Sequence, residues 1–364
     1  MNAIPQRLSL VGQTVACLQS AISAGQWQEW LPAERTLCET LQVSRSTLRR
    51  ALAQLKRNGA IRAQHGAGNR IVRRRTPPRG YRRFRDVALL APEPLERLRP
   101  TQTLWIDELR AMLSERGCRL HVLHGHQFFS ARPDAALEKL VRQHPHGCWI
   151  LLLSNAACQR WFARRGEPCL IAGSCLPGID LPSRDLDHRA ACRHAAGVLL
   201  GLGHRRLAFL AQKSPLAGDI ESEAGFLEGV RRSRDAAIHA TVVRHDTTAA
   251  GILQALRPLM APTTRPTALL VPNAFYYLAV VTGLAQLDWH VPRQVSVISR
   301  DEDPFLSFIT PAPARYVVSP RVYARSILHA VAELLEGGNI GLRATQLMPR
   351  FVRGASIDRV PAAD

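Results

Sequence analysis

The sequence has little lysine, no long apolar run and no cysteine pair at metal-binding spacing. Lysine occurs only at Lys56, Lys139 and Lys213, so nearly all of the 48 basic residues are arginine. Arginine is the side chain best shaped to bind phosphate or guanine through two hydrogen bonds. No stretch approaches the roughly 20 consecutive apolar residues of a membrane span, and the N-terminus lacks the pattern of a signal peptide. We therefore expect a cytoplasmic protein that has no membrane partner.

The eight cysteines also lack the spacing of a functional site. None forms a C-x-x-C pair, and most lie in apolar runs such as CWILLL and PCLIAG, which indicates buried, reduced thiols. Ser154 and Ser174 have no G-x-S-x-G context for nucleophilic catalysis. We therefore expect no catalytic residue, no metal and no cofactor, and we predict that the protein is not an enzyme.

Acidic residues are scarce at the start of the chain. Residues 1–85 hold 16 Lys and Arg but only three Asp and Glu, which gives this region 13 of the 19 net positive charges. Such a region suits a polyanion, because condensed counterions are released when arginines replace them on phosphates. An anionic membrane is the weaker alternative, because no lysine-rich amphipathic face with large apolar anchors is present.

A length of 364 residues indicates two or three domains, since one domain usually takes about 100–200 residues. We predict a first domain over residues 1–75, a basic linker rich in arginine over 76–85, and a larger domain over 86–358. The linker serves either as a solvated tether or as a phosphate contact beside the first domain.

The first domain has the pattern of three helices and two short strands. We expect helices over 8–24, 33–41 and 44–58, and strands over 60–62 and 69–73.

The third of these helices is amphipathic. Leu48, Leu52 and Leu55 recur at helical spacing and form one apolar stripe, whereas Arg45 and Arg49 lie one turn apart on the opposite face. This orientation buries the leucines and presents two guanidinium groups near the N-terminal end, the end that reads the major groove in helix-turn-helix proteins.

Residues 31–72 resemble the GntR family of winged helix-turn-helix regulators. The shared pattern includes LPAER at Leu31–Arg35, VSRSTLR at Val43–Arg49, and the later Leu55 and Gly59. The resemblance implies binding to double-stranded operator DNA, with Arg35 contacting DNA from the second helix and with Arg45 and Arg49 reading bases.

The same resemblance implies further DNA contacts. Ser44, Ser46 and Thr47 offer hydroxyl groups to phosphates or base edges, and His65 and Gly66 would lie at the tip of the wing, near the minor groove. Ala33 replaces the usual serine, and the wing sequence HGAGNRIV departs from the family pattern.

From residue 86 onward, apolar strand-like runs alternate with helical stretches. This alternation predicts an α/β fold with parallel sheets covered by helices on both faces, and the number of units suggests two lobes. We expect strands over 87–91, 119–123, 148–153, 169–173, 207–211, 240–244, 268–271 and 295–299, and helices over 103–116, 134–143, 155–165, 188–202, 219–233, 248–260, 275–287 and 320–336.

The larger domain resembles the LacI and periplasmic-binding-protein type of sensor. The resemblance rests on LDHRAACRHAAGVLLGLGHRRLAFLA at Leu186–Ala211, on RPTALLVPNAFYYLAVVTGLAQLDWHVPRQVSVISRDED within Arg265–Pro311, and on QLMPRFVRGAS near the end. It implies a two-lobed domain that closes over a small-molecule effector. Three positions depart from the family pattern: Ser222 replaces an arginine, Ala274 an aspartate, and Arg300 an aromatic residue.

The resemblance also implies which residues bind the effector. Asp301 matches the first acid of the family's DD motif, whose carboxylate accepts hydrogen bonds from ligand hydroxyls. Asn273 matches the asparagine of the ND motif, and Phe275 follows it on the same loop. Because of the three departures, an unusual sugar, an oligosaccharide and lost effector binding all remain open.

Together these observations predict a DNA-binding transcriptional regulator, a repressor controlled by a carbohydrate-like effector. We expect a homodimer, because each recognition helix reads only a few base pairs. One alternative is an enzyme that acts on a small polar ligand in the two-lobed domain. The other is an architectural DNA-binding dimer without an effector.

Overall fold

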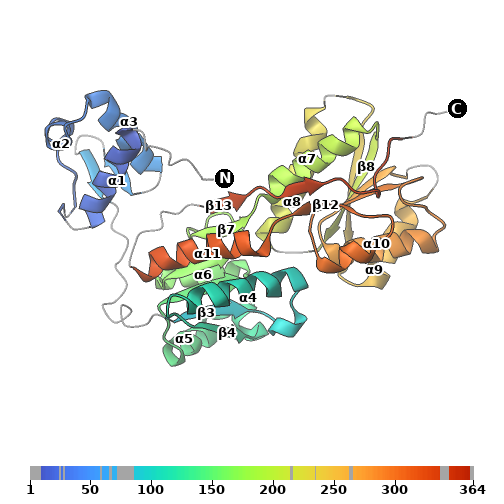
Figure 1. The fold of residues 1–364 in the computed structure, drawn as a ribbon, viewed down its shortest axis with the longest axis horizontal. Coiled ribbons are helices and arrows are strands. Elements are labelled where there is room, and N and C mark those ends of the chain that lie inside the picture. Colours follow the sequence, from blue (N-terminus) through green and yellow to red (C-terminus); the bar gives the residue numbers. More distant parts are fainter. Residues whose placement is uncertain are drawn as a thin grey trace.

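The fold is that of a computed structural model of the chain (Figure 1). It describes residues 10–23, 26–27, 29–57, 60–64, 68–71, 86–213, 216–233, 235–261, 265–336 and 344–360. The predicted linker over 76–85 and the predicted wing residues His65 and Gly66 lie outside the described residues. No helix of the described part of the chain is long and apolar enough to cross a membrane.

The N-terminal unit consists of three helices and a β-hairpin, in the order that the sequence predicted. Its elements are α1 (Leu10–Ser23), α2 (Glu34–Leu41), α3 (Arg45–Arg57), β1 (Ile61–Gln64) and β2 (Gly68–Ile71). The two strands are antiparallel, and one core packs all five elements together.

A second unit contains a six-stranded sheet in which every pairing is parallel, with the order β13-β7-β6-β5-β3-β4. The helices α4 and α11 cover one face of this sheet, and α5 and α6 cover the other. We call this unit the first lobe. Its elements are β3 (Val87–Ala91), α4 (Pro100–Ser114), β4 (Leu120–His124), α5 (Asp134–Gln143), β5 (Cys148–Leu152), α6 (Ala156–Arg165), β6 (Cys169–Ala172), β7 (Ser183–Leu186), α11 (Pro320–Leu335) and β13 (Ala344–Leu347).

A third unit, the second lobe, repeats this architecture with the strand order β14-β12-β11-β10-β8-β9. Only its edge strand β14 is antiparallel to its neighbour. The helices α7 and α8 cover one face, and α9 and α10 cover the other. Its elements are α7 (His188–Gly201), β8 (Arg206–Gln212), α8 (Ala217–Arg232), β9 (His239–His245), α9 (Ala249–Leu259), β10 (Ala268–Val271), α10 (Ala274–Gln286), β11 (Ser296–Ser299), β12 (Ala314–Val317) and β14 (Arg350–Val352).

The chain passes between the two lobes three times: after β7, after β12 and after β13. The α/β fold class with parallel sheets is confirmed, and each of the eight expected strands of the larger domain starts and ends within one residue of its predicted bounds. The sequence analysis did not predict β7, β12, β13 or β14.

Two glycines of α8 allow this helix to lie directly against α7. A Cβ atom on Gly225 would stand 2.1 Å from the carbonyl oxygen of Arg189, and one on Gly229 would stand 2.7 Å from the Cβ of Ala196. Both distances are far below a van der Waals contact, so no other residue fits at these positions without moving one helix.

We therefore predict that Gly225→Ala destabilises the protein, although alanine is the better helix former. The expected loss is about 1–3 kcal/mol, because the added methyl group overlaps the backbone of α7. Gly197→Ala is the matched control: no atom lies within 4 Å of its added Cβ, so it should stabilise the protein by about 0.5–1 kcal/mol. Urea unfolding followed by circular dichroism measures both. Equal stability of the two variants would contradict the close packing of α7 and α8.

Candidate functional site

The helix α3 has one buried face and one exposed basic face. Leu48, Leu52 and Leu55 are at most 2% exposed, whereas the side chains of Arg45 and Arg49 are 71% and 62% exposed. The structure thus orients the helix as its apolar stripe predicted.

Three hydroxyl groups gather at the N-terminus of α3. The Ser44 hydroxyl accepts a hydrogen bond from the backbone N–H of Thr47 at 3.2 Å, which caps the helix. The same oxygen lies 2.9 Å from the Ser46 hydroxyl and 2.9 Å from the Thr47 hydroxyl. A helix N-terminus carries partial positive charge, so this end of α3 is suited to phosphate or base-edge acceptors.

One acid of α2 holds both arginines of α3. The Glu34 carboxylate lies 3.0 Å from Nε of Arg49 and 3.7 Å from Nε of Arg45. Arg35, also on α2, is 90% exposed and pairs with Glu39 at 3.2 Å. The role of Glu34 could not be predicted from the sequence, because its partners Arg45 and Arg49 lie on a different helix.

A second candidate site lies between the two lobes. It is a cavity of about 450 Å³ to which both lobes contribute side chains. The first lobe supplies, among others, Arg97, Arg99, Gln102, Trp105, Asp185 and Tyr323, and the second lobe supplies Gln212, Gly218, Asp219, Asn273, Arg300 and Asp301.

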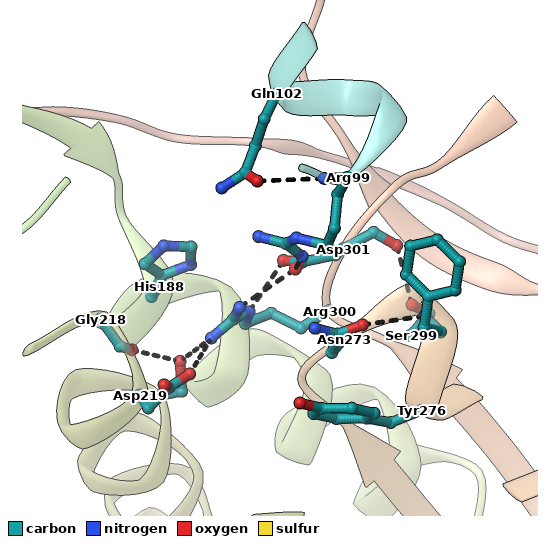
Figure 2. Close-up of polar contacts among 12 residues, drawn as sticks. Arg99, Gln102, His188, Gly218, Asp219, Asn273, Tyr276, Ser299, Arg300 and Asp301 are labelled. Atoms are coloured by element: carbon teal, nitrogen blue, oxygen red, sulfur yellow. Dashed lines mark hydrogen bonds and ion pairs between the residues drawn. The ribbon is translucent and has the colours of Figure 1, made fainter. Parts of the chain in front are cut away.

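Asp301 is buried and bound by two arginines (Figure 2). Arg300 donates to both carboxylate oxygens, at 2.9 and 3.1 Å, and Arg99 donates to one of them from the other lobe, at 2.5 Å. Burial alone would raise the pKa of Asp301, but the two guanidinium groups outweigh it and hold this pKa well below its usual value. Asp301 is therefore ionised and forms a salt bridge across the cavity.

Arg300 occupies the centre of this cluster. Its remaining nitrogen donates to the Ser222 hydroxyl at 2.5 Å and lies 3.6 Å from Asp219. Burial disfavours its charge, but the negative charge of Asp301 raises its pKa. Ser222 and Arg300, two positions at which the sequence departs from the sensor family, are thus in direct contact.

Within the second lobe, the cluster extends through the neutral side chains of Gln212 and Tyr276. The Gln212 amide donates to Asp219 at 2.7 Å, and the Tyr276 hydroxyl donates to the Gln212 amide oxygen at 2.5 Å. On the other side of the cavity, Ser174 donates to Asp185 at 2.6 Å, and His188 lies 3.3 Å from the same carboxylate. Burial would raise the pKa of Asp185, but His188 and these hydrogen bonds lower it.

The three residues predicted to bind an effector do not share one location. Asp301 and Asn273 line the cavity. Phe275 does not line it: its ring is 44% exposed and packs on Phe305, with ring centroids 5.0 Å apart. The reason is that the Asn273 side chain caps α10 by accepting from the backbone N–H of Phe275 at 2.8 Å, which starts the helix there and turns Phe275 outward.

The cysteines are free thiols in different environments. Cys148, Cys158, Cys169 and Cys192 are buried as predicted, but Cys17 is exposed. Burial raises the pKa of Cys158 and of Cys192 to about 12, so neither forms a thiolate readily at neutral pH. Among the residues that the structure describes, no group of three or more His, Cys, Asp or Glu side chains is arranged to hold a metal ion.

Comparison with known families matches both parts of the chain. Residues 10–71 match the family described as bacterial regulatory proteins, gntR family, and residues 196–357 match the periplasmic binding protein-like domain. Among curated proteins, the HTH-type transcriptional regulator GalS of Salmonella typhimurium is 25% identical over 247 residues, which cover 65% of this chain and 70% of GalS. AscG of Escherichia coli is 23% identical over 153 residues, which cover 42% of this chain and 46% of AscG.

Solved structures agree with the fold of the two lobes. A putative transcriptional regulator LacI from Bacillus cereus subsp. cytotoxis covers 76% of this chain and 99% of its own, with a TM-score of 0.67 and 18% identity. The match to the transcriptional regulator CelR in complex with cellobiose covers 96% of this chain and 100% of the CelR chain, with a TM-score of 0.66 and 20% identity. The chain is therefore a transcriptional regulator that joins a domain matched by the gntR family, over residues 10–71, to a periplasmic binding protein-like domain, over residues 196–357.

Proposed function

We propose that this regulator is a repressor that binds operator DNA through α3 and is controlled by a carbohydrate held between its two lobes. One observation carries the first half of the proposal: α3 buries its leucines and exposes Arg45 and Arg49 beside a hydroxyl-rich N-terminus. The second half is supported by a cavity that both lobes line with polar side chains.

Each predicted DNA contact has a role in the proposal. Arg45 and Arg49 read base edges in the major groove, where a guanidinium pairs with guanine through two hydrogen bonds. Arg35, Ser44, Ser46 and Thr47 bind phosphates and fix the position of the helix. His65 and Gly66, which lie outside the described residues, are the proposed contacts to the minor groove.

The effector acts by shifting a population of lobe arrangements. A ligand that contacts both lobes favours the arrangement in which they are closed, and the closed dimer no longer presents both recognition helices at the spacing of the operator half-sites. Two neighbours of similar fold support the choice of a carbohydrate. One is the CelR–cellobiose complex, and the other is a LacI family regulator from Enterococcus faecium with bound ribose, which has a TM-score of 0.62 and 14% identity.

Substitution of the two exposed arginines tests the DNA-binding half of the proposal. Arg45→Ala and Arg49→Ala should each weaken binding to the operator by about 1–3 kcal/mol, with a much smaller effect on unrelated DNA. Lys56→Ala, at the exposed far end of the same helix, is the control and should bind nearly as the parent protein does. Fluorescence anisotropy with operator and scrambled duplexes measures all three. Undiminished specificity of the double variant would refute this assignment.

The role of Glu34 gives a separate prediction. Its carboxylate orients Arg45 and Arg49 and also opposes the phosphates, so Glu34→Gln should strengthen binding to scrambled DNA while reducing discrimination in favour of the operator. Glu39→Gln removes the same charge from α2 but pairs only with Arg35, so it should strengthen binding to both duplexes equally. If both variants keep the specificity of the parent protein, Glu34 does not position the two arginines.

A further inference from the structure

Five acids line the cavity, and each already has a partner elsewhere in the chain; Glu93 pairs with His126, and Glu302 pairs with Arg315 through one oxygen. Arg300 and Arg99 donate to the two oxygens of Asp301, and Gln212 donates to one oxygen of Asp219 while Arg300 lies 3.6 Å from the other. Ser174, His188 and a backbone N–H bind Asp185. These carboxylates therefore have little capacity left to accept hydrogen bonds from the hydroxyl groups of a ligand.

Two amide side chains of the cavity are fixed with their nitrogen atoms unused. The amide oxygen of Gln102 accepts from the backbone N–H of Arg99 at 3.2 Å, and that of Asn273 accepts from the backbone N–H of Phe275 at 2.8 Å. A backbone N–H can only donate, so each contact determines which amide atom is oxygen. Neither NH₂ group has an acceptor within the described part of the chain, and Figure 2 shows that of Gln102 directed away from the Arg99 backbone.

Arg99 offers the strongest free donors. Its Nη1 atom binds Asp301, but Nε and Nη2 have no acceptor among the described residues, and the side chain is 28% exposed at the cavity wall. These two N–H groups form the edge of a guanidinium that binds carboxylate or phosphate through two parallel hydrogen bonds. The positive charges of Arg99 and Arg300 balance the negative charges of Asp301 and Asp219. An anion bound at the Nε–Nη2 edge of Arg99 therefore meets no uncompensated negative charge among these four residues.

We propose that the effector is an acidic carbohydrate whose carboxylate or phosphate group binds the free edge of Arg99. This inference rests on the proposed function, since it specifies the ligand class of the same cavity. A neutral sugar brings hydroxyl donors that need acceptors, and Asp301 and Asp185 already accept several hydrogen bonds from the chain. An acid group brings only acceptors, which the Nε–Nη2 edge of Arg99 and the NH₂ groups of Gln102 and Asn273 can satisfy.

Calorimetric titration of the full chain with matched sugars tests the ligand class. The panel pairs glucose and galactose with their uronates and their 6-phosphates, and adds cellobiose as a neutral disaccharide. At least one acidic sugar should bind about ten-fold or more tighter than its neutral parent, because hydrogen bonds between charged groups are stronger than those between neutral groups. Comparison of the uronates with the 6-phosphates shows whether a carboxylate or a phosphate group supplies the negative charge.

Variants of Arg99 test the site. Arg99→Gln should lower the affinity for the acidic sugar about ten-fold, to that of the neutral parent, and Asp301 keeps Arg300 as its partner in this variant. Arg99→Lys keeps the charge but cannot form two parallel hydrogen bonds to an acid group. Its affinity for the acidic sugar should therefore fall between those of the parent protein and of Arg99→Gln. Arg110→Gln, an exposed arginine of α4 that pairs with Asp107 outside the cavity, is the matched control and should bind as the parent protein does.

Three outcomes would overturn the proposal. If neutral sugars bind as tightly as the acidic ones, the ligand class is wrong but the proposed control by a carbohydrate stands. If acidic sugars bind equally well to Arg99→Gln, the acid group lies elsewhere. If no sugar of the panel binds, the further inference and the effector half of the proposed function both fail.

Discussion

Burial of the leucine stripe on α3 is the constraint on which the DNA-binding side of the molecule depends. Turning this helix about its axis would expose Leu48, Leu52 and Leu55, at a cost of roughly 1.5–3 kcal/mol for each side chain. The helix is therefore locked in the one orientation that turns Arg45 and Arg49 toward solvent, where Glu34 holds both guanidinium groups. A helix free to rotate would present the same arginines in many directions and could not recognise a fixed sequence of bases.

A comparable constraint acts in the cavity between the lobes, where it involves charged side chains instead of leucines. A buried carboxylate is costly unless donors satisfy it, and removal of one partner leaves an uncompensated charge. Asp301 and Arg300 therefore fix each other, and the donors that remain determine what can bind beside them. Because Arg99 precedes α4 of the first lobe and Asp301 follows β11 of the second, their salt bridge joins the two lobes directly at the cavity.

Sequence reasoning was accurate where periodicity and apolar runs carry the signal, and it failed where structure depends on distant partners. The interior strands were predicted because they are continuous apolar runs, but β7 and β13 read SRDL and ATQL and become strands only because neighbours supply hydrogen bonds. Asp301 and Asn273, which were chosen because they match family motifs, both line the cavity. The outward turn of Phe275 follows from the helix cap that Asn273 makes. Arg99 was missed because 202 residues separate it from Asp301. The two departures from the family pattern at Ser222 and Arg300 could have indicated that these two residues contact each other.

The most direct test of this account is a competition mobility shift at one fixed salt concentration. It would compare the DNA upstream of the regulator's own gene with a scrambled duplex of equal length and composition. The account predicts that the natural sequence is bound at least about 10³-fold more tightly, as expected for specific recognition. Equal affinity for the two duplexes would show that α3 binds phosphates alone, and would contradict the claim that Arg45 and Arg49 read bases.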